Sequence, residues 1–156
     1  MKKIIFSLLL ILLITNACGF KVVNQSELTN FSIEEINTTG DKRINYKIRN
    51  KLLSLSKKEG NKFVKLKINT TKNKTIKEKN IKNEITKYQI TIKIVIEISD
   101  TNFDKINLLT VSKGGDYNVA TQHSQTLRNE KKLIELLTDS LIQKILEELS
   151  IRINDL

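Results

Sequence analysis

The clearest pattern along the chain is the alternation of apolar and polar residues between Tyr88 and Ile98. A period of two over this length predicts a β-strand with one buried face. Shorter alternating or mixed runs predict three more strands. They cover residues 31–36, with an irregularity at the end, residues 63–68, and residues 106–112, which continue past a bulge at Gly114-Gly115 toward residue 121.

Apolar residues three and four positions apart predict two amphipathic helices. The first helix has Ile44, Ile48, Leu52 and Leu55 on its apolar face. The turn-like residues 37–41 precede it, Asp41 is its expected N-cap, and Gly60 is its expected C-cap. The second helix covers about residues 126–153, and its apolar stripe consists of Leu133, Ile134, Leu137, Leu141, Ile145 and Leu149.

The predicted order of elements is strand, helix, strand, strand, strand, helix. Each helix has one apolar stripe, so both need a common apolar surface, which the isoleucine faces of the strands supply. The pattern therefore predicts an α+β two-layer sandwich, in which a mostly antiparallel four-stranded sheet carries two helices on one face. Residues 31–156 would form this single domain, and the lysine-rich residues 71–84 would be a mobile hairpin connection.

The first residues of the chain resemble an export signal. Lys2 and Lys3 precede an apolar run from Ile4 to Ile14, after which the chain becomes small and polar. The run is shorter than the ~20 residues that a membrane-spanning helix needs, which disfavours the alternative of a permanent transmembrane anchor. Residues 1–17 are therefore interpreted as a signal peptide.

Cys18 is the only cysteine, so it has no partner for an internal disulfide. Ala17-Cys18 resembles the lipobox of bacterial lipoproteins, although Thr15 stands where that pattern prefers an aliphatic residue. The resemblance implies a covalent diacylglycerol and an N-acyl chain on Cys18, with residues 18–30 as a lipidated tether and no other cofactor. Gly19 directly follows the cysteine, and in this position it resembles lipoproteins that are sent to the outer membrane. The alternative is a free cysteine after an ordinary cleavage site.

Lysine dominates the charged residues of the chain. Loss of Lys2 and Lys3 with the leader lowers the formal net charge from +10 to +8, and such a surface attracts phosphates and other polyanions. The alternative is a solvated surface in a lysine-biased proteome. The candidate ligand-binding residues, on strand faces and in the basic connection, are Lys65, Lys67, Lys72, Lys74, Lys77, Lys87 and Lys93, with Lys79 and Lys82 beside them.

Residue patterns typical of catalysis are missing from the sequence. His123 is the single histidine and lies in a polar stretch, where a solvated position leading into a helix is expected rather than a metal site. The side chains of the adjacent pairs Glu34-Glu35 and Glu147-Glu148 point in diverging directions, so neither pair is expected to act as a cooperating acid and base. Nucleic-acid binding is not expected either, because the basic stretch lacks aromatic residues and the chain carries an export signal.

Several short patterns are similar to the LPS-assembly lipoprotein family (LptE). They are Cys18-Gly19-Phe20 at the mature start, Asp41-Lys42-Arg43 followed by Ile48-Arg49-Asn50-Lys51-Leu52, Thr86-Lys87-Tyr88-Gln89-Ile90 in the long strand, and Tyr117-Asn118-Val119 before the terminal helix. The similarity extends over essentially the whole chain after the leader.

This resemblance implies a non-catalytic lipoprotein of the outer membrane. It would face the periplasm, sit inside the lumen of the LptD-like β-barrel translocon as plug and assembly partner, and assist lipopolysaccharide insertion. The lysines named above would meet lipopolysaccharide phosphates. Two alternatives remain open: another outer-membrane lipoprotein that acts as an adaptor for an envelope complex, and an exported enzyme with an unrecognised site.

Overall fold

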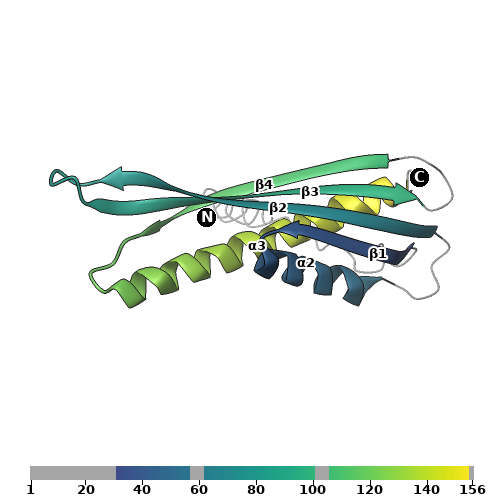
Figure 1. The fold of residues 1–156 in the computed structure, drawn as a ribbon, viewed down its shortest axis with the longest axis horizontal. Coiled ribbons are helices and arrows are strands. Elements are labelled where there is room, and N and C mark those ends of the chain that lie inside the picture. Colours follow the sequence, from purple (N-terminus) through teal and green to yellow (C-terminus); the bar gives the residue numbers. More distant parts are fainter. Residues whose placement is uncertain (1–30, 57–61, 101–105, 155–156) are drawn as a thin grey trace, which may run out of the picture.

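The computed structural model describes residues 31–56, 62–100 and 106–154, which form an elongated molecule of one sheet and two helices (Figure 1). The expected signal peptide, Cys18 and the tether lie outside the described residues. The elements in chain order are β1 (Phe31–Gly40), α2 (Lys42–Leu55), β2 (Lys62–Lys79), β3 (Ile85–Asp100), β4 (Ile106–Asn118) and α3 (His123–Asn154).

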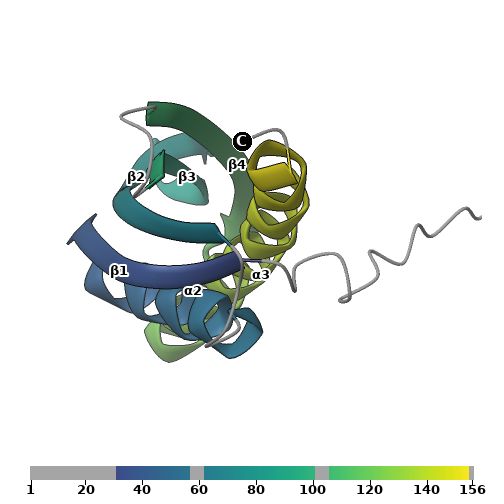
Figure 2. The ribbon, with the colours of Figure 1, turned by 90° about the vertical axis from the view of Figure 1, so that its right-hand side faces the viewer.

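The sheet has the strand order β1-β2-β3-β4. β1 runs parallel to β2, whereas the β2–β3 and β3–β4 pairs are antiparallel. Both helices lie on the same face of the curved sheet, as the view along the long axis shows (Figure 2). The predicted fold class, an α+β sandwich with a mostly antiparallel four-stranded sheet and two helices on one face, is confirmed.

β3 forms the centre of the hydrophobic core. Its five inward isoleucines, Ile90, Ile92, Ile94, Ile96 and Ile98, are completely buried. Apolar residues of β2, β4 and both helices pack against them in one continuous cluster. Burial of a large aliphatic side chain contributes about 1.5–3 kcal/mol, so this isoleucine face is the main reason that the two layers associate.

The predicted hairpin connection at residues 71–84 is a hairpin, but its predicted extent was wrong. β2 continues to Lys79, paired with β3 from Thr71↔Lys93 to Ile76↔Tyr88 in regular register and then with a register shift on each side of Glu78, and the connection occupies only residues 80–84. Local apolar content does not explain this extension. The long β3 needs a hydrogen-bonding partner along its whole length, and β2 provides it.

β1 is longer than predicted, because residues 37–40 continue the strand instead of forming a turn. The expected irregularity is confirmed as a register shift between Ile33 and Glu35. Gly40 then adopts φ +91°, where an added Cβ would lie 1.9 Å from the carbonyl oxygen of Thr70. Only glycine permits this close approach, which turns the chain from β1 into α2.

Asp41 caps α2 as predicted. Its carboxylate accepts hydrogen bonds from the backbone N–H groups of Arg43, at 3.1 Å, and Ile44, at 3.2 Å. The expected C-cap at Gly60 was wrong, because α2 ends at Leu55 and Ser56 is the C-cap. Gly60 itself lies outside the described residues.

β4 follows β3 without the bulge expected at Gly114-Gly115. Gly114 pairs with Thr91 and Gly115 with Ile90 in unbroken register. An added Cβ at Gly115 would lie 2.8 Å from a methyl group of Leu133, so this glycine makes room for α3 rather than bending the strand. The strand ends at Asn118, and α3 starts at His123, slightly earlier than predicted.

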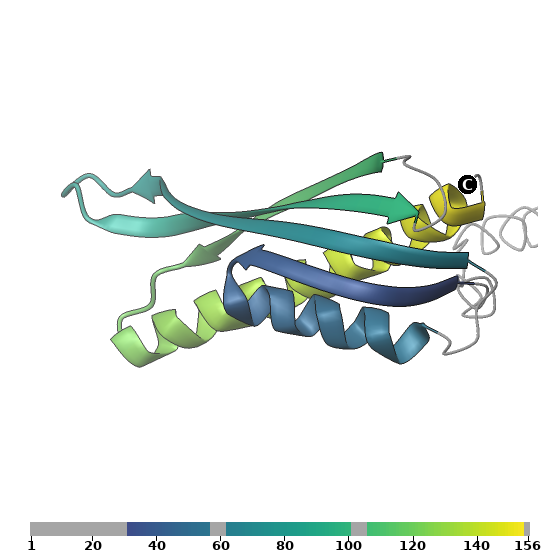
Figure 3. The same ribbon diagram turned by 45° about the vertical axis from the view of Figure 1, so that its right-hand side comes forward.

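The two ends of the elongated molecule are formed by different elements. The start of β1, the start of β4 and the end of α3 lie at one end, called the base here; the turn between β2 and β3 lies at the other, called the tip (Figure 3). Because β1 and β2 are parallel and Phe31 is paired with Lys62, the chain enters the fold at the base. The 18-residue β2 spans about 60 Å at ~3.3 Å per residue.

Candidate functional site

The sheet face opposite the helices is covered by no element among the described residues (Figure 2). Side chains on this outer face alternate along β2 and β3 with the buried residues of the core. Four of the candidate ligand-binding lysines project there: Lys65, Lys67, Lys87 and Lys93. The outer face also carries exposed apolar side chains near the base, Phe63, Ile106 and Leu108. Its polar residues are Asn69, Thr71, Asn73, Thr75, Gln89, Thr91, Thr110 and Ser112.

Three of these four lysines have acidic partners. The ammonium of Lys65 lies 3.6 Å from a carboxylate oxygen of Glu34, that of Lys67 lies 3.4 Å from Glu97, and that of Lys87 lies 2.7 Å from Glu78. Lys93 has no ion pair within the described part of the chain. Partly exposed pairs of this kind contribute only about 0–1 kcal/mol, so an incoming phosphate can compete for these lysines.

The lysines expected in one basic connection are divided between the two faces of the sheet. Lys72 and Lys74 point to the helix side, where they pair with Asp41 at 2.7 Å and Glu130 at 2.6 Å. Lys77 is paired with Asp116 of β4. The structure therefore does not unite the candidate residues in one patch, and Lys72 and Lys74 have structural partners that a ligand would have to displace.

A cation–aromatic cluster surrounds Lys74. The Tyr88 and Tyr117 rings stack with centroids 5.6 Å apart, and the Lys74 ammonium lies 4.4 Å from the centre of the Tyr88 ring. The Tyr117 hydroxyl donates a 2.8 Å hydrogen bond to Glu130, which also binds Lys74. The cluster joins β2, β3 and β4 to the first half of α3.

Burial and pairing act in opposite directions on the charged groups of this cluster. Burial raises the pKa of Glu130, but hydrogen bonds from Lys74 and Tyr117 outweigh it, so the pKa lies below its usual value. Burial lowers the pKa of Lys74, and its hydrogen bonding with Glu130 and Tyr117 outweighs that effect, so the pKa lies above its usual value. Burial is the main cause that raises the pKa of Tyr117. The Lys74–Glu130 pair is therefore held in its charged form.

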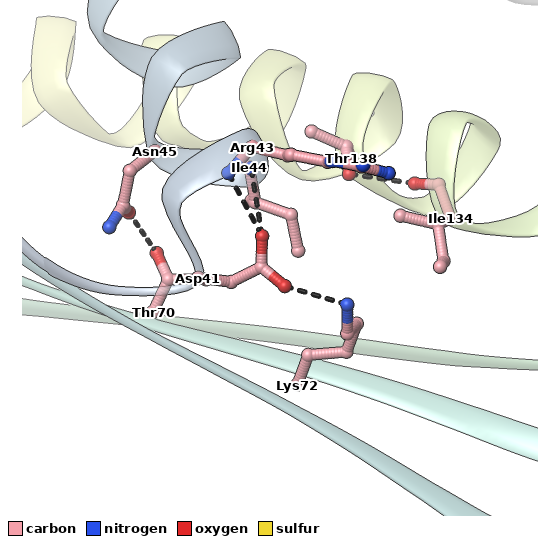
Figure 4. Close-up of polar contacts among 8 residues, drawn as sticks. All are labelled: Asp41, Arg43, Ile44, Asn45, Thr70, Lys72, Ile134 and Thr138. Carbon is pink, nitrogen blue, oxygen red and sulfur yellow. Dashed lines mark hydrogen bonds and ion pairs between the residues drawn. The ribbon is translucent and has the colours of Figure 1, made fainter. Parts of the chain in front are cut away.

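A groove of about 420 Å³ lies between α2, α3 and β2. Figure 4 shows its polar centre, where Asp41 joins the N-terminus of α2 to Lys72. Burial raises the pKa of Asp41, but the hydrogen bond from Lys72 and those from the α2 backbone hold it below its usual value. Arg43 also lines the groove and has no ion pair in the described part of the chain. Apolar lining comes from Ile44, Leu127 and Ile134.

His123 is exposed at the first residue of α3 and borders a second cavity of about 270 Å³ that also contacts Lys74 and Tyr88. The described ranges contain no group of three His, Cys, Asp or Glu side chains arranged to hold a metal ion. Neither described helix combines the length and the hydrophobicity of a membrane-spanning segment.

No protein-family model and no curated protein matches this chain. Its structure is similar to the crystal structure of rare lipoprotein B from Shewanella oneidensis, with 11% sequence identity, a TM-score of 0.60, and coverage of 77% of this chain and 97% of that chain. It is also similar to the solution structure of lipoprotein B from Nitrosomonas europaea, with 13% identity, a TM-score of 0.65, and coverage of 87% and 93%. The chain therefore has the fold of these lipoprotein structures over nearly their whole length.

Proposed function

We propose that this chain is a non-catalytic outer-membrane lipoprotein, anchored through lipid on Cys18, which plugs and helps to assemble the β-barrel translocon for lipopolysaccharide. The observation that carries the proposal is the shared fold with two lipoprotein B structures, together with Ala17-Cys18 after a segment that resembles an export signal. The family resemblance of the sequence points to the same kind of protein.

The outer face of the sheet supports this role. A plug needs a rigid core and a polar exterior, since the lumen of a large barrel is polar. The continuous isoleucine core provides rigidity, and the hydroxyl, amide and lysine side chains of the outer face provide the polar surface. In this proposal Lys65, Lys67 and Lys93 meet lipid A or core phosphates, while Lys72 and Lys74 stabilise the fold.

The proposal is tested by purifying the tagged protein from its native membranes in mild detergent and identifying the proteins that co-elute. We expect a large outer-membrane β-barrel protein in a one-to-one ratio. A Cys18→Ala variant provides the control for the anchor, since it should leave the membrane fraction and recover less barrel protein. Recovery of a cell-wall enzyme or an inner-membrane complex without a barrel would reject the plug and favour an adaptor lipoprotein.

A further inference from the structure

The tip of the β2–β3 hairpin combines exposed apolar side chains with two lysines, Lys79 and Lys82, that form no ion pair with any described residue. Ile81 is fully exposed in the turn, and Ile76 is half exposed on β2 shortly before it. Lys82 follows Ile81 directly, and its ammonium has no partner among the described residues. In the part of the chain that the structure describes, the ammonium of Lys79 is bound only to the side-chain oxygen of Asn83, at 2.9 Å.

The turn that carries Ile81 is held by its own hydrogen bonds. The side-chain oxygen of Asn80 accepts from the backbone N–H groups of Lys82, at 2.9 Å, and Glu84, at 3.0 Å. The backbone N–H of Asn80 donates to the carbonyl of Glu84 at 2.9 Å, and Asn83 adopts the left-handed conformation with φ 63°. This network fixes Ile81 in an outward position, where it packs against no part of the core.

The charge of the apex is positive, because Lys79 and Lys82 outnumber Glu84, its one carboxylate without an ion pair among the described residues. Glu78 is paired with Lys87 at 2.7 Å, and Glu84 accepts a 2.7 Å hydrogen bond from the side-chain amide of Asn80. The amide that donates to Glu84 carries no charge, so Glu84 stays anionic, but it forms no ion pair with Lys79 or Lys82 among the described residues, and both ammonium groups remain available to an anion. Ile81 lies at a narrow convex apex between two available lysines. This arrangement suits a deformable anionic surface better than a preformed pocket on a protein.

We propose that the hairpin tip binds an anionic lipid surface. Ile81 enters the boundary between headgroups and acyl chains, while Lys79 and Lys82 contact lipid phosphates; apolar burial and attraction to anionic lipid act together in such contacts. The chain enters the fold at the base, beside Lys62, so the tip makes a second membrane contact at the far end of the molecule from the proposed anchor (Figure 3). This inference goes beyond the proposed function and needs no barrel partner.

The first test measures co-sedimentation with vesicles of mixed phosphatidylglycerol and phosphatidylcholine, and with vesicles of phosphatidylcholine alone. The protein is the chain from residue 18 with Cys18→Ser, which carries no acyl chain and retains every described core residue, since these lie between Ile44 and Leu149. We expect binding to anionic vesicles only. Ile81→Ser should weaken it about tenfold, and Lys79→Gln and Lys82→Gln about fivefold each.

Matched controls lie on elements other than the β2–β3 hairpin. Leu108→Ser removes an exposed apolar residue near the base, and Lys132→Gln with Lys144→Gln removes two exposed charges from α3. Binding should remain within twofold of the parent chain in these variants. Equal losses in the tip and control variants would overturn the proposal, since they would indicate a nonspecific effect of charge and hydrophobicity.

The second test uses the absence of tryptophan from the sequence. A single Ile81→Trp substitution places a unique fluorophore at the tip, and Leu108→Trp places one near the base. We expect anionic vesicles to shift the Ile81→Trp emission to shorter wavelength, with quenching by brominated acyl chains, and to leave Leu108→Trp unchanged. An unshifted Ile81→Trp signal would overturn the lipid contact and favour a protein partner for the tip; recovery of the barrel protein would be unaffected, so the two proposals fail separately.

Discussion

The Tyr117 hydroxyl and the Glu130 carboxylate form a 2.8 Å hydrogen bond that connects the end of β4 to the first half of α3. The same carboxylate binds Lys74 of β2 at 2.6 Å. Beyond Gly40, which pairs with Thr70, β2 has no β1 beside it, so the sheet narrows toward the tip. The Tyr117–Glu130 contact and its lysine therefore fasten α3 to the narrow part of the sheet.

We expect Glu130→Gln to lower the free energy of unfolding by about 1–2 kcal/mol at pH 7, because it removes a charge-assisted hydrogen bond. A carboxylate whose pKa is lower in the folded state stabilises the fold above its unfolded value, here 4.5, and loses that contribution as the pH falls through the folded value. The difference from the parent chain should therefore shrink below pH 4.5. Urea denaturation at several pH values measures it, with the exposed Glu135→Gln as control. A difference that stays constant down to pH 3 would contradict the pKa direction.

Asn45 is a buried polar residue of α2 with two partners in the sheet. Its side-chain oxygen accepts a 2.6 Å hydrogen bond from the Thr70 hydroxyl, and its amide donates to the carbonyl of Thr39 at 2.8 Å. Asn45→Ala removes both of these hydrogen bonds at a buried position, so we expect a loss of about 2–3 kcal/mol. Asn50→Ala, at an exposed position of the same helix, should cost little. Similar thermal unfolding of the two variants would show that the buried pair contributes nothing.

Gly40 offers a test of the junction between β1 and α2. Gly40→Ala requires a residue with a side chain at φ +91° and places its Cβ against the carbonyl of Thr70, so we expect a loss of at least about 2 kcal/mol. Gly114→Ala is the matched control, because its added Cβ would lie 3.3 Å from the side-chain hydroxyl of Thr91 and at an ordinary 3.5 Å from the carbonyl oxygen of Ile90. Calorimetry measures both. Equal melting temperatures would show that the β1–α2 junction can relax.

The lysines of the outer face provide a test of ligand binding. We expect Lys65→Gln, Lys67→Gln and Lys93→Gln together to weaken binding to purified lipopolysaccharide about tenfold, since each removes a charge-assisted donor to phosphate. Thermal stability should change little, because the partners of these lysines are weak or missing among the described residues. Lys42→Gln with Lys144→Gln, on the exposed helix surfaces, is the control. Unaltered binding by the triple variant would exclude this face.

The alternation of apolar residues was sufficient to predict the fold class, because the isoleucines of β3 and the stripes of the two helices require a common core. It was not sufficient for residues 71–79, whose strand structure depends on pairing with β3 and not on their own hydrophobicity. The expected bulge at Gly114-Gly115 failed for a related reason. The need for a small residue there arises from Leu133 on another element.

The site was predictable only in part. Lys72 and Lys74 continue the even-numbered series of Val64 to Thr70, so the alternation contained the signal that they point to the helices. The sequence contained no such signal for the cluster around Lys74, because this cluster depends on the register between β3 and β4 and on the position of α3. The lipid anchor lies outside the described residues and stays a prediction.

The parallel pairing of β1 with β2 also has a consequence for the order of folding. At the tip, the paired residues Lys79 and Ile85 are separated by only a short turn. Phe31, in contrast, pairs with Lys62, which follows α2 in the sequence. Contacts between residues close in sequence form sooner than distant ones. We therefore expect the β2–β3 hairpin to form first, starting at its turn, β4 to pair next, and β1 with α2 to dock last. The first strand that the ribosome synthesises would then be the last strand to join the sheet.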